Sequence, residues 1–239
     1  DPEVLGDAFF LMGALPGEAF EYSIPAWLAA DPVEGAHSVC SQWFDAFTTL
    51  QNMPVEHMPP GERTVQEEVD YWLAVSREYE ADAELVRILE HLSASPPRTT
   101  GAPTPVHGDT KHGNCLWHEG KLTALLDWEM ARISEPMLDL GYILMFHDQG
   151  PASLGDAGYE LPGWWSADRM IAEWEARTGR TAVDASLYTV LGQAKVAAII
   201  SVGAHLFRTG RINDPRFEGF ANLLPAYLDL LQKRAMAAF

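Results

Sequence analysis

The stretch VHGDTKHGN, residues 106–114, decides how this chain is interpreted. It places two histidines, an aspartate, a lysine and an asparagine around two glycines. Three interpretations are open for such a stretch: a cluster of metal ligands, a catalytic loop, or a polar turn between strands. The sequence on either side has to decide between them.

A predicted β-hairpin follows this stretch directly. Residues 114–118 and 121–126 are short, largely apolar runs, and the pair Glu119-Gly120 between them is typical of a tight turn. The second run ends at Asp127, so the hairpin would return Asp127 to the neighbourhood of Asp109. Two carboxylates and an amide that converge make an oxygen-rich site suited to Mg²⁺. Phosphoryl transfer needs such a set: a base that orients a hydroxyl, and metal ligands that hold phosphates in line.

The spacing resembles the catalytic loop of the protein-kinase-like fold. His107-Gly108-Asp109-x-x-x-x-Asn114 is similar to H-x-D-x-x-x-x-N, and Asp127-Trp128-Glu129 stands where protein kinases have D-F-G. SEPMLDLG, residues 134–141, is similar to the G-D-P-x-x-D-L-A segment of the aminoglycoside phosphotransferase and choline kinase family. Each element alone is a weak signal, but three in order with compatible spacing point to that family.

The resemblance implies a role for each matching residue. Asp109 would be the catalytic base that faces the substrate hydroxyl, and Lys111 would lie near the γ-phosphate. Asn114 and Asp127 would bind Mg²⁺ together with the phosphates of ATP. Asp139 would brace the loop, although an acid early in a helix is favoured by the helix dipole in any case. Without the resemblance, Lys111 is equally well explained as a solvated loop lysine.

Zinc is the main alternative to this assignment, because His107, His112 and His118 lie close together in sequence. Neither a cysteine partner nor an H-E-x-x-H pattern accompanies these histidines, and strand alternation would divide them between two faces. The sequence therefore favours Mg²⁺ over zinc.

The rest of the chain predicts a mostly helical protein. We expect an α+β fold that is predominantly helical: the C-terminal lobe of a protein-kinase-like phosphotransferase, with a small β-hairpin insert carrying the catalytic loop. Thr64 and Glu67 fit a capping box at the start of one helix. The predicted helices span residues 36–51, 64–79, 81–93, 134–147, 166–178, 184–208 and 215–237.

The N-terminal segment FFLMGAL, residues 9–15, predicts a strand that Pro16-Gly17 closes. It resembles the family's hinge, the strand and linker that meet the adenine. On that match Met12, Gly13 and Ala14 would line the adenine site. We therefore divide the chain into residues 1–20, a hinge strand and linker left from the N-lobe, and residues 21–239, a helical C-lobe with catalytic loop 107–114 and metal segment 127–129.

Two parts of such a kinase are missing upstream of the loop. No G-x-G-x-x-G precedes residue 107, and the first lysine in the sequence is Lys111, so no upstream lysine can hold the phosphates. We expect an ATP- and Mg²⁺-dependent small-molecule kinase whose 239-residue piece is an inactive fragment lacking the N-lobe. The alternative is a non-catalytic, pseudokinase-like binding module.

Composition limits the partners. The formal net charge of −18 repels nucleic acid and anionic membranes, so neither is expected as a partner. Two cysteines, Cys40 and Cys115, are too few for a disulfide scaffold and fit a cytoplasmic protein. The expected substrate is a small hydroxyl-bearing molecule bound among the helices after residue 150, with Trp164-Trp165 as a candidate wall.

Overall fold

The structure of the chain is a computed structural model that describes residues 6, 9, 12–58, 61–149, 153, 158–214 and 216–239, apart from the side chains of Arg216 and Phe220. Helices dominate the described part. The helices are α2 (Ala26–Ala30), α3 (Pro32–Gln51), α4 (Val65–Glu78), α5 (Ala83–Ala94), α6 (Met137–Leu144), α7 (Ala167–Thr178), α8 (Ala185–Arg208) and α9 (Arg216–Ala238). The strands are β1 (Thr104–Val106), β2 (Cys115–His118), β3 (Lys121–Leu125) and β4 (Arg132–Ser134).

The predominantly helical prediction is confirmed, and the predicted capping box is present. The Thr64 backbone N–H donates to Glu67 Oε2 at 2.8 Å, and the Glu67 backbone N–H donates to Thr64 Oγ1 at 3.2 Å. A cap of this kind stabilises a helix by about 1 kcal/mol. It fixes where α4 begins, directly after the loop that approaches β4.

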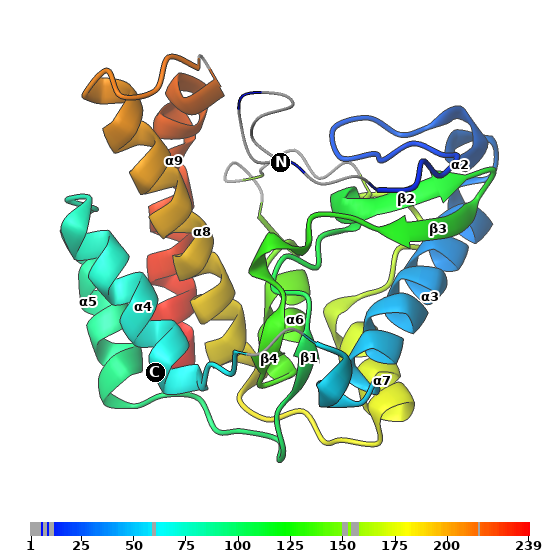
Figure 1. The fold of residues 1–239 in the computed structure, drawn as a ribbon, viewed down its shortest axis with the longest axis horizontal. Coiled ribbons are helices and arrows are strands. Elements are labelled where there is room, and N and C mark those ends of the chain that lie inside the picture. The colour runs from blue at the N-terminus through cyan, green and yellow to red at the C-terminus, as the bar shows by residue number, and fades with distance from the viewer. Residues whose placement is uncertain are drawn as a thin grey trace.

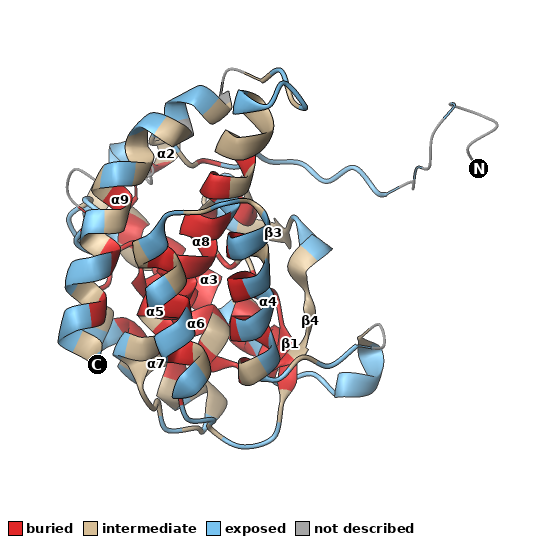
Figure 2. Ribbon diagram, turned by 90° about the vertical axis from the view of Figure 1, so that its left-hand side faces the viewer, coloured by how far each residue is buried: buried red, intermediate tan, exposed pale blue. Residues whose placement is uncertain are grey.

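The helices surround the short strands (Figure 1). Helices α4, α5, α8 and α9 form one side of the molecule, α3 and α7 form the other, and α6 lies between them with β1 and β4. The core runs through all of these helices, and α8 is buried along most of its length (Figure 2). By length and composition, α8 is the one helix in the described ranges that is apolar enough to cross a membrane. Within its apolar window, however, 67% of the residues are buried inside the fold, as in a core helix.

Helices α6 and α8 pack with their backbones in contact. A Cβ added to Gly141 on α6 would lie 2.5 Å from the backbone carbon of Tyr188, and one added to Gly192 on α8 would lie 3.1 Å from the Tyr142 Cα. Only glycine permits such an approach. The contact sets the distance between α8 and the start of α6, where Asp139 lies.

Two separate sheets frame the catalytic loop. β1 pairs antiparallel with β4, with Thr104 opposite Ser134. β2 pairs antiparallel with β3, with Cys115 opposite Leu125. The loop of residues 107–114 joins β1 to β2 and therefore connects the two sheets, whereas the sequence placed it on a single hairpin. Strand β4, which the sequence did not predict, supplies the partner of β1.

The strand predicted at residues 9–15 is wrong where the structure describes it. Phe9 and residues 12–15 are not in a strand, and residues 10 and 11 lie outside the described residues. The first pairing along the described chain is at Glu18, whose backbone exchanges two hydrogen bonds with Trp117, of 2.8 and 2.9 Å. The apolar pattern of residues 9–15 indicated a strand, but a strand also needs a neighbour that satisfies its backbone.

Candidate active site

The catalytic loop leaves β1 through a turn that only glycine can make. Gly108 has φ +82°, and a Cβ there would lie 2.5 Å from the Met130 carbonyl oxygen. The buried carboxylate of Asp139, on α6, accepts from the backbone N–H groups of His107 at 3.0 Å and Gly108 at 2.8 Å. Gln51 donates to the same carboxylate at 3.2 Å. Asp139 thus braces the start of the loop, as the resemblance implied.

Asp109 and Asn114 face each other across the loop. The Asn114 side-chain amide donates to Asp109 Oδ2 at 2.8 Å and to the Asp109 carbonyl oxygen at 2.9 Å. The other carboxylate oxygen, Asp109 Oδ1, is buried and has no hydrogen-bond partner among the described residues. His107 ties the loop to the residue that follows β3, since its Nε2 lies 2.9 Å from the Leu126 carbonyl oxygen. The arrangement fixes one oxygen of Asp109 and leaves the other without a hydrogen-bond partner among the described residues.

Asp127 comes to the loop through the end of β3. The Leu126 N–H donates to the Asn114 carbonyl oxygen at 2.8 Å, which places Asp127 next to the loop. Asp127 is exposed, has a left-handed backbone (φ +62°), and makes no hydrogen bond through its carboxylate to the residues that the structure describes.

These oxygens fit a magnesium ion. The carboxylate of Asp127 and the side-chain oxygen of Asn114, whose nitrogen is the atom engaged with Asp109, are hard donors of the kind Mg²⁺ takes. Within the described ranges, no group of three or more His, Cys, Asp or Glu side chains is arranged to hold a metal. The zinc alternative therefore gains no support.

Lys111 forms an ion pair with Glu21, which precedes α2. Its Nζ lies 2.9 Å from Glu21 Oε1, and both side chains are about a quarter exposed. Met12, Gly13 and Ala14 are exposed, and a Cβ added to Gly13 would meet no atom within 4 Å. The roles of Lys111 at the γ-phosphate and of residues 12–14 at the adenine remain predictions.

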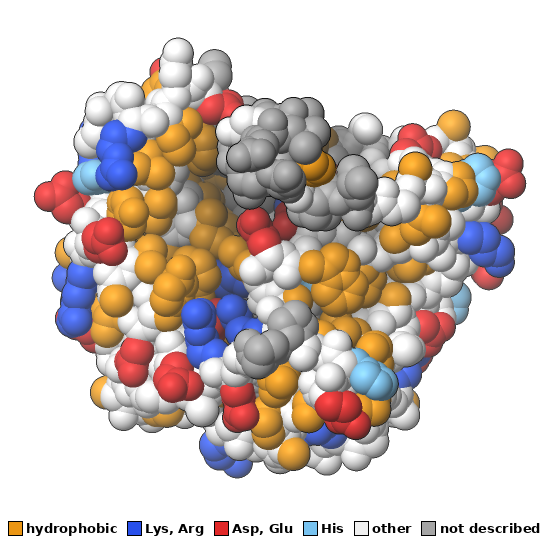
Figure 3. All heavy atoms as spheres, in the orientation of Figure 1, with side chains coloured by type: hydrophobic (Ala, Val, Ile, Leu, Met, Phe, Trp, Pro, Cys, Tyr) orange, Lys and Arg blue, Asp and Glu red, His pale blue; other side chains and the backbone are white. Residues whose placement is uncertain are grey.

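A hollow of about 250 Å³ opens beside Asp109. The polar side of this hollow is formed by Asp109, Lys111, Glu21 and Glu129. Its other walls are largely apolar, and Figure 3 shows hydrophobic side chains on the sides of the hollow between α8 and the central strands. The apolar lining residues are Met130, Tyr142, Phe146, Val196, Ile199, Ile200 and Phe217.

Trp165 belongs to the core, Trp164 packs half-buried against it, and neither lines the hollow beside Asp109. Trp165 is 2% exposed and donates through its ring nitrogen to His37 at 3.1 Å. The Trp164 ring lies 5.3 Å from that of His112 and 6.1 Å from that of Trp43, centroid to centroid. These aromatic rings enclose His112, and burial lowers its pKa to about 3. His112 is consequently a neutral core residue.

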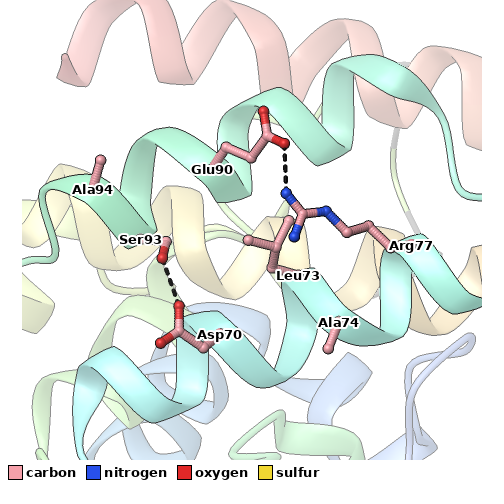
Figure 4. Close-up of a pocket in the computed structure, with 7 residues that line it drawn as sticks. All are labelled: Asp70, Leu73, Ala74, Arg77, Glu90, Ser93 and Ala94. Carbon is pink, nitrogen blue, oxygen red and sulfur yellow. Dashed lines mark hydrogen bonds and ion pairs between the residues drawn. The ribbon is translucent and has the colours of Figure 1, made fainter.

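A second hollow, of about 510 Å³, lies between α4 and α5 (Figure 4). Its charged groups are paired with one another: Arg77 contacts Glu90 at 2.7 Å, and the Ser93 hydroxyl donates to Asp70 at 2.5 Å. None of its lining residues belongs to the catalytic loop. This second hollow therefore offers no group of the catalytic loop to a ligand.

Sequence reasoning missed Lys195. This residue lies in the middle of α8, is 5% exposed, and donates from Nζ to the carbonyl oxygen of Gly108 inside the loop. A signal was available: Lys195 is the only lysine in the apolar run of residues 184–208. A lone cation on a buried helix is expected to have a partner.

Comparison with known proteins places this geometry in a family. The model of the Phosphotransferase enzyme family matches residues 1–176. Acyl-CoA dehydrogenase family member 11 of Mus musculus is 26% identical over 157 aligned residues, and the match covers 62% of this chain and 20% of that protein. The chain thus spans about a fifth of the length of the curated relatives it matches.

Solved structures show the same fold at low sequence identity. A protein of Ralstonia eutropha assigned as an aminoglycoside phosphotransferase superposes with a TM-score of 0.76 at 17% identity, covering 95% of this chain and 71% of that one. A choline/ethanolamine kinase family protein of Mesorhizobium loti gives 0.53 at 18% identity, covering 92% and 69%. The chain therefore belongs to the phosphotransferase enzyme family and has the protein-kinase-like fold of the aminoglycoside phosphotransferases and choline kinases.

Proposed function

We propose that this chain is the catalytic part of a kinase that transfers the γ-phosphoryl group of ATP to a hydroxyl of a small molecule. One observation carries the proposal: Asp109 lines the hollow, Asn114 holds one of its carboxylate oxygens, and the other oxygen has no partner among the described residues. A carboxylate in this state can orient a hydroxyl and accept its proton.

The proposed step balances as an in-line displacement. A bond forms between the acceptor hydroxyl oxygen and the γ-phosphorus, and the bond from that phosphorus to the bridging oxygen of ATP breaks. ADP leaves with the electron pair of the broken bond. The hydroxyl proton passes to the Asp109 carboxylate.

Magnesium, when bound, neutralises the phosphate charge that develops during transfer. Asn114 and Asp127 are the residues that would hold it. Asn114 would then serve two purposes, since its amide nitrogen also fixes the Asp109 carboxylate.

The acceptor is proposed to enter from the side of α8 and α9. The walls that Val196, Ile200 and Phe217 form there are apolar, and α8 contains no acidic residue along its whole length. An alcohol with an apolar carbon skeleton would bury apolar surface against that wall. A cationic group would meet carboxylates on the opposite, polar side of the hollow, at Glu21, Asp109 and Glu129. The net charge of −18 does not alter this local preference.

The 239 residues alone are proposed to be inactive. A kinase of this fold clamps the phosphates with a glycine-rich loop and a strand lysine, and neither precedes residue 107. The second candidate is a binding module without catalysis. The two differ in whether the full-length protein releases ADP in the presence of an acceptor.

The test uses the full-length protein with Asp109→Asn, and Asp45→Asn as the control for loss of an exposed carboxylate. ADP release is measured across a panel of hydroxyl compounds that includes aminoglycosides and apolar alcohols. We expect Asp109→Asn to lower kcat by about 100-fold or more, a large general-base effect, with nucleotide binding unchanged. Turnover at the wild-type rate in Asp109→Asn would rule out the assignment of the base.

A further inference from the structure

We propose that Lys195 is a positioning residue that fixes the peptide unit between Gly108 and Asp109 and so sets the direction of the Asp109 carboxylate. The proposal rests on the proposed function in one respect, since it takes Asp109 as the reacting group. The contact itself, from Lys195 Nζ to the Gly108 carbonyl oxygen, is independent of that function.

The place of Lys195 in the fold requires an explanation. It lies in the apolar middle of α8 between Ala194 and Val196, and only 5% of the residue is exposed. Burying an ammonium group costs several kcal/mol unless it is well paired. Its own helix offers no acidic side chain, so the partner has to come from another element.

The hydrogen bond to Gly108 meets this need and clamps the loop. A peptide unit is planar, so holding the Gly108 carbonyl oxygen also holds the Asp109 N–H, which donates to His107 Nδ1 at 3.3 Å. On the other side of the same residue, the Gly108 N–H donates to Asp139 at 2.8 Å. Gly108, which has the conformational freedom to turn, is thus fixed at both ends by charged groups.

The surroundings keep a positive charge at this place. The carboxylates that face Lys195 are Glu68 on α4, Asp109 in the loop and Asp139 on α6, and the cation that faces it is Arg132 on β4. The aromatic rings of Tyr142 and Trp72 lie 4.9 Å and 5.9 Å from Nζ.

None of these groups takes the place of Gly108 as the partner of Lys195. Glu68 is already engaged with Arg63 at 3.0 Å and with Arg132 at 2.9 Å. The bond from Lys195 to the Gly108 carbonyl oxygen therefore ties α8 directly to the catalytic loop.

The charge of Lys195 is expected to be sensitive to alkaline pH. Burial lowers the pKa of its ammonium group to about 8, and the three carboxylates act against that decrease. Lys195 is thus mostly charged at neutral pH and loses its proton as the pH rises through about 8. The bond to the Gly108 carbonyl oxygen then weakens, because a charged donor makes the stronger hydrogen bond.

The first experiment uses the 239-residue chain and needs no catalysis. Lys195→Met removes the ammonium group at similar side-chain volume, and Lys233→Met removes an exposed lysine of α9 as the control. We expect Lys195→Met to move the NMR resonances of the Asp109 carboxyl carbon and the Asn114 side-chain amide, and Lys233→Met to leave them in place. Unchanged resonances in a folded Lys195→Met chain would overturn the positioning role.

The second experiment measures phosphoryl transfer by the full-length protein against pH. Lys195→Met should lower kcat by about 10- to 100-fold, the cost of a misplaced catalytic group, while KM for ATP changes less than about twofold. Lys195→Arg keeps a charge that does not titrate in this range, so it should restore part of kcat and remove the decline above about pH 8. An alkaline decline that persists unchanged in Lys195→Arg would contradict the proposal.

The two experiments separate the possible failures. If the wild-type full-length protein transfers no phosphoryl group to any acceptor, the proposed function fails, and the resonances of the 239-residue chain still decide whether Lys195 positions Asp109. If Lys195→Met fails to fold, Lys195→Arg decides through its pH profile.

Discussion

Replacing Asp139 with asparagine tests the loop geometry most directly. The Asp139 carboxylate is fully buried and accepts hydrogen bonds from the backbones of His107 and Gly108 and from the side chain of Gln51. Asparagine keeps one oxygen acceptor and puts an NH₂ donor where the second oxygen was. One backbone N–H of the loop would then face another donor.

The expected cost follows from these contacts. A buried hydrogen bond to a charged group contributes about 1.5 to 3 kcal/mol, and leaving a buried donor without a partner costs about 1 to 3 kcal/mol more. We therefore expect Asp139→Asn to lower the free energy of unfolding by about 2.5 to 6 kcal/mol. The His107 and Gly108 amide protons should also exchange with solvent faster, because their hydrogen bonds to Asp139 protect them in the wild-type chain.

Urea unfolding monitored by tryptophan fluorescence measures the change, with hydrogen exchange resolving the two amides. Asp45→Asn is the matched control: the Asp45 carboxylate also has a partner, Arg177 at 2.8 Å, but its side chain is 64% exposed. An exposed pair of this kind contributes about 1 kcal/mol or less. If Asp139→Asn and Asp45→Asn lower stability equally, Asp139 does not brace the loop in the way described.

Three further predictions concern the loop and the core. Gly108→Ala should destabilise the chain by about 2 to 4 kcal/mol in urea unfolding, because of its positive φ and its contact with Met130, while Gly179→Ala, with positive φ but open space, should cost about 1 kcal/mol. Burial raises the pKa of the Cys40 thiol to about 12 and raises that of Cys115 as well, so neither should react with a disulfide reagent at pH 8 until the chain unfolds; rapid reaction of the native chain would contradict their burial. His112 stays neutral in the fold down to about pH 3, whereas in the unfolded chain it takes up a proton near pH 6.5. The free energy of unfolding should therefore decrease as the pH is lowered from about 6.5 to about 3. His112→Phe should reduce that loss, measured as the difference between urea midpoints at pH 7 and pH 5.

Local patterns in the sequence predicted much of this structure. Apolar periodicity located the long helices, and the Thr64 and Glu67 pair located the start of α4 because both partners of a capping box lie within four residues. The spacing of Asp109, Asn114 and Asp127 predicted a loop and a strand end that the structure brings together. Such features depend on residues that are close together in sequence, so they can be predicted from a single sequence.

The features that were missed depend on partners far away in sequence. β4 is a three-residue strand whose existence depends on pairing with β1, about 30 residues earlier, and no local pattern indicates that pairing. The apolar segment at residues 9–15 looked like a strand because of its composition, but the described part has no neighbour to pair with. Trp164 and Trp165 looked like a substrate wall because they lie in a predicted loop, yet both rings pack against aromatic rings of α3, Trp165 buried and Trp164 half-buried.

Helix α8 shows why the catalytic loop could be recognised while its support could not. The helix presents Val196, Ile199 and Ile200 to the hollow beside Asp109, and one residue earlier it presents Lys195 to the loop itself. It is also held against α6, which carries Asp139, by the close glycine contact at Gly141. Any displacement of α8 would consequently move the apolar wall of the hollow and the Gly108 peptide together. If the proposed function is right, substitutions on this wall that displace α8 should alter kcat as well as the choice of acceptor, because both depend on the position of one helix.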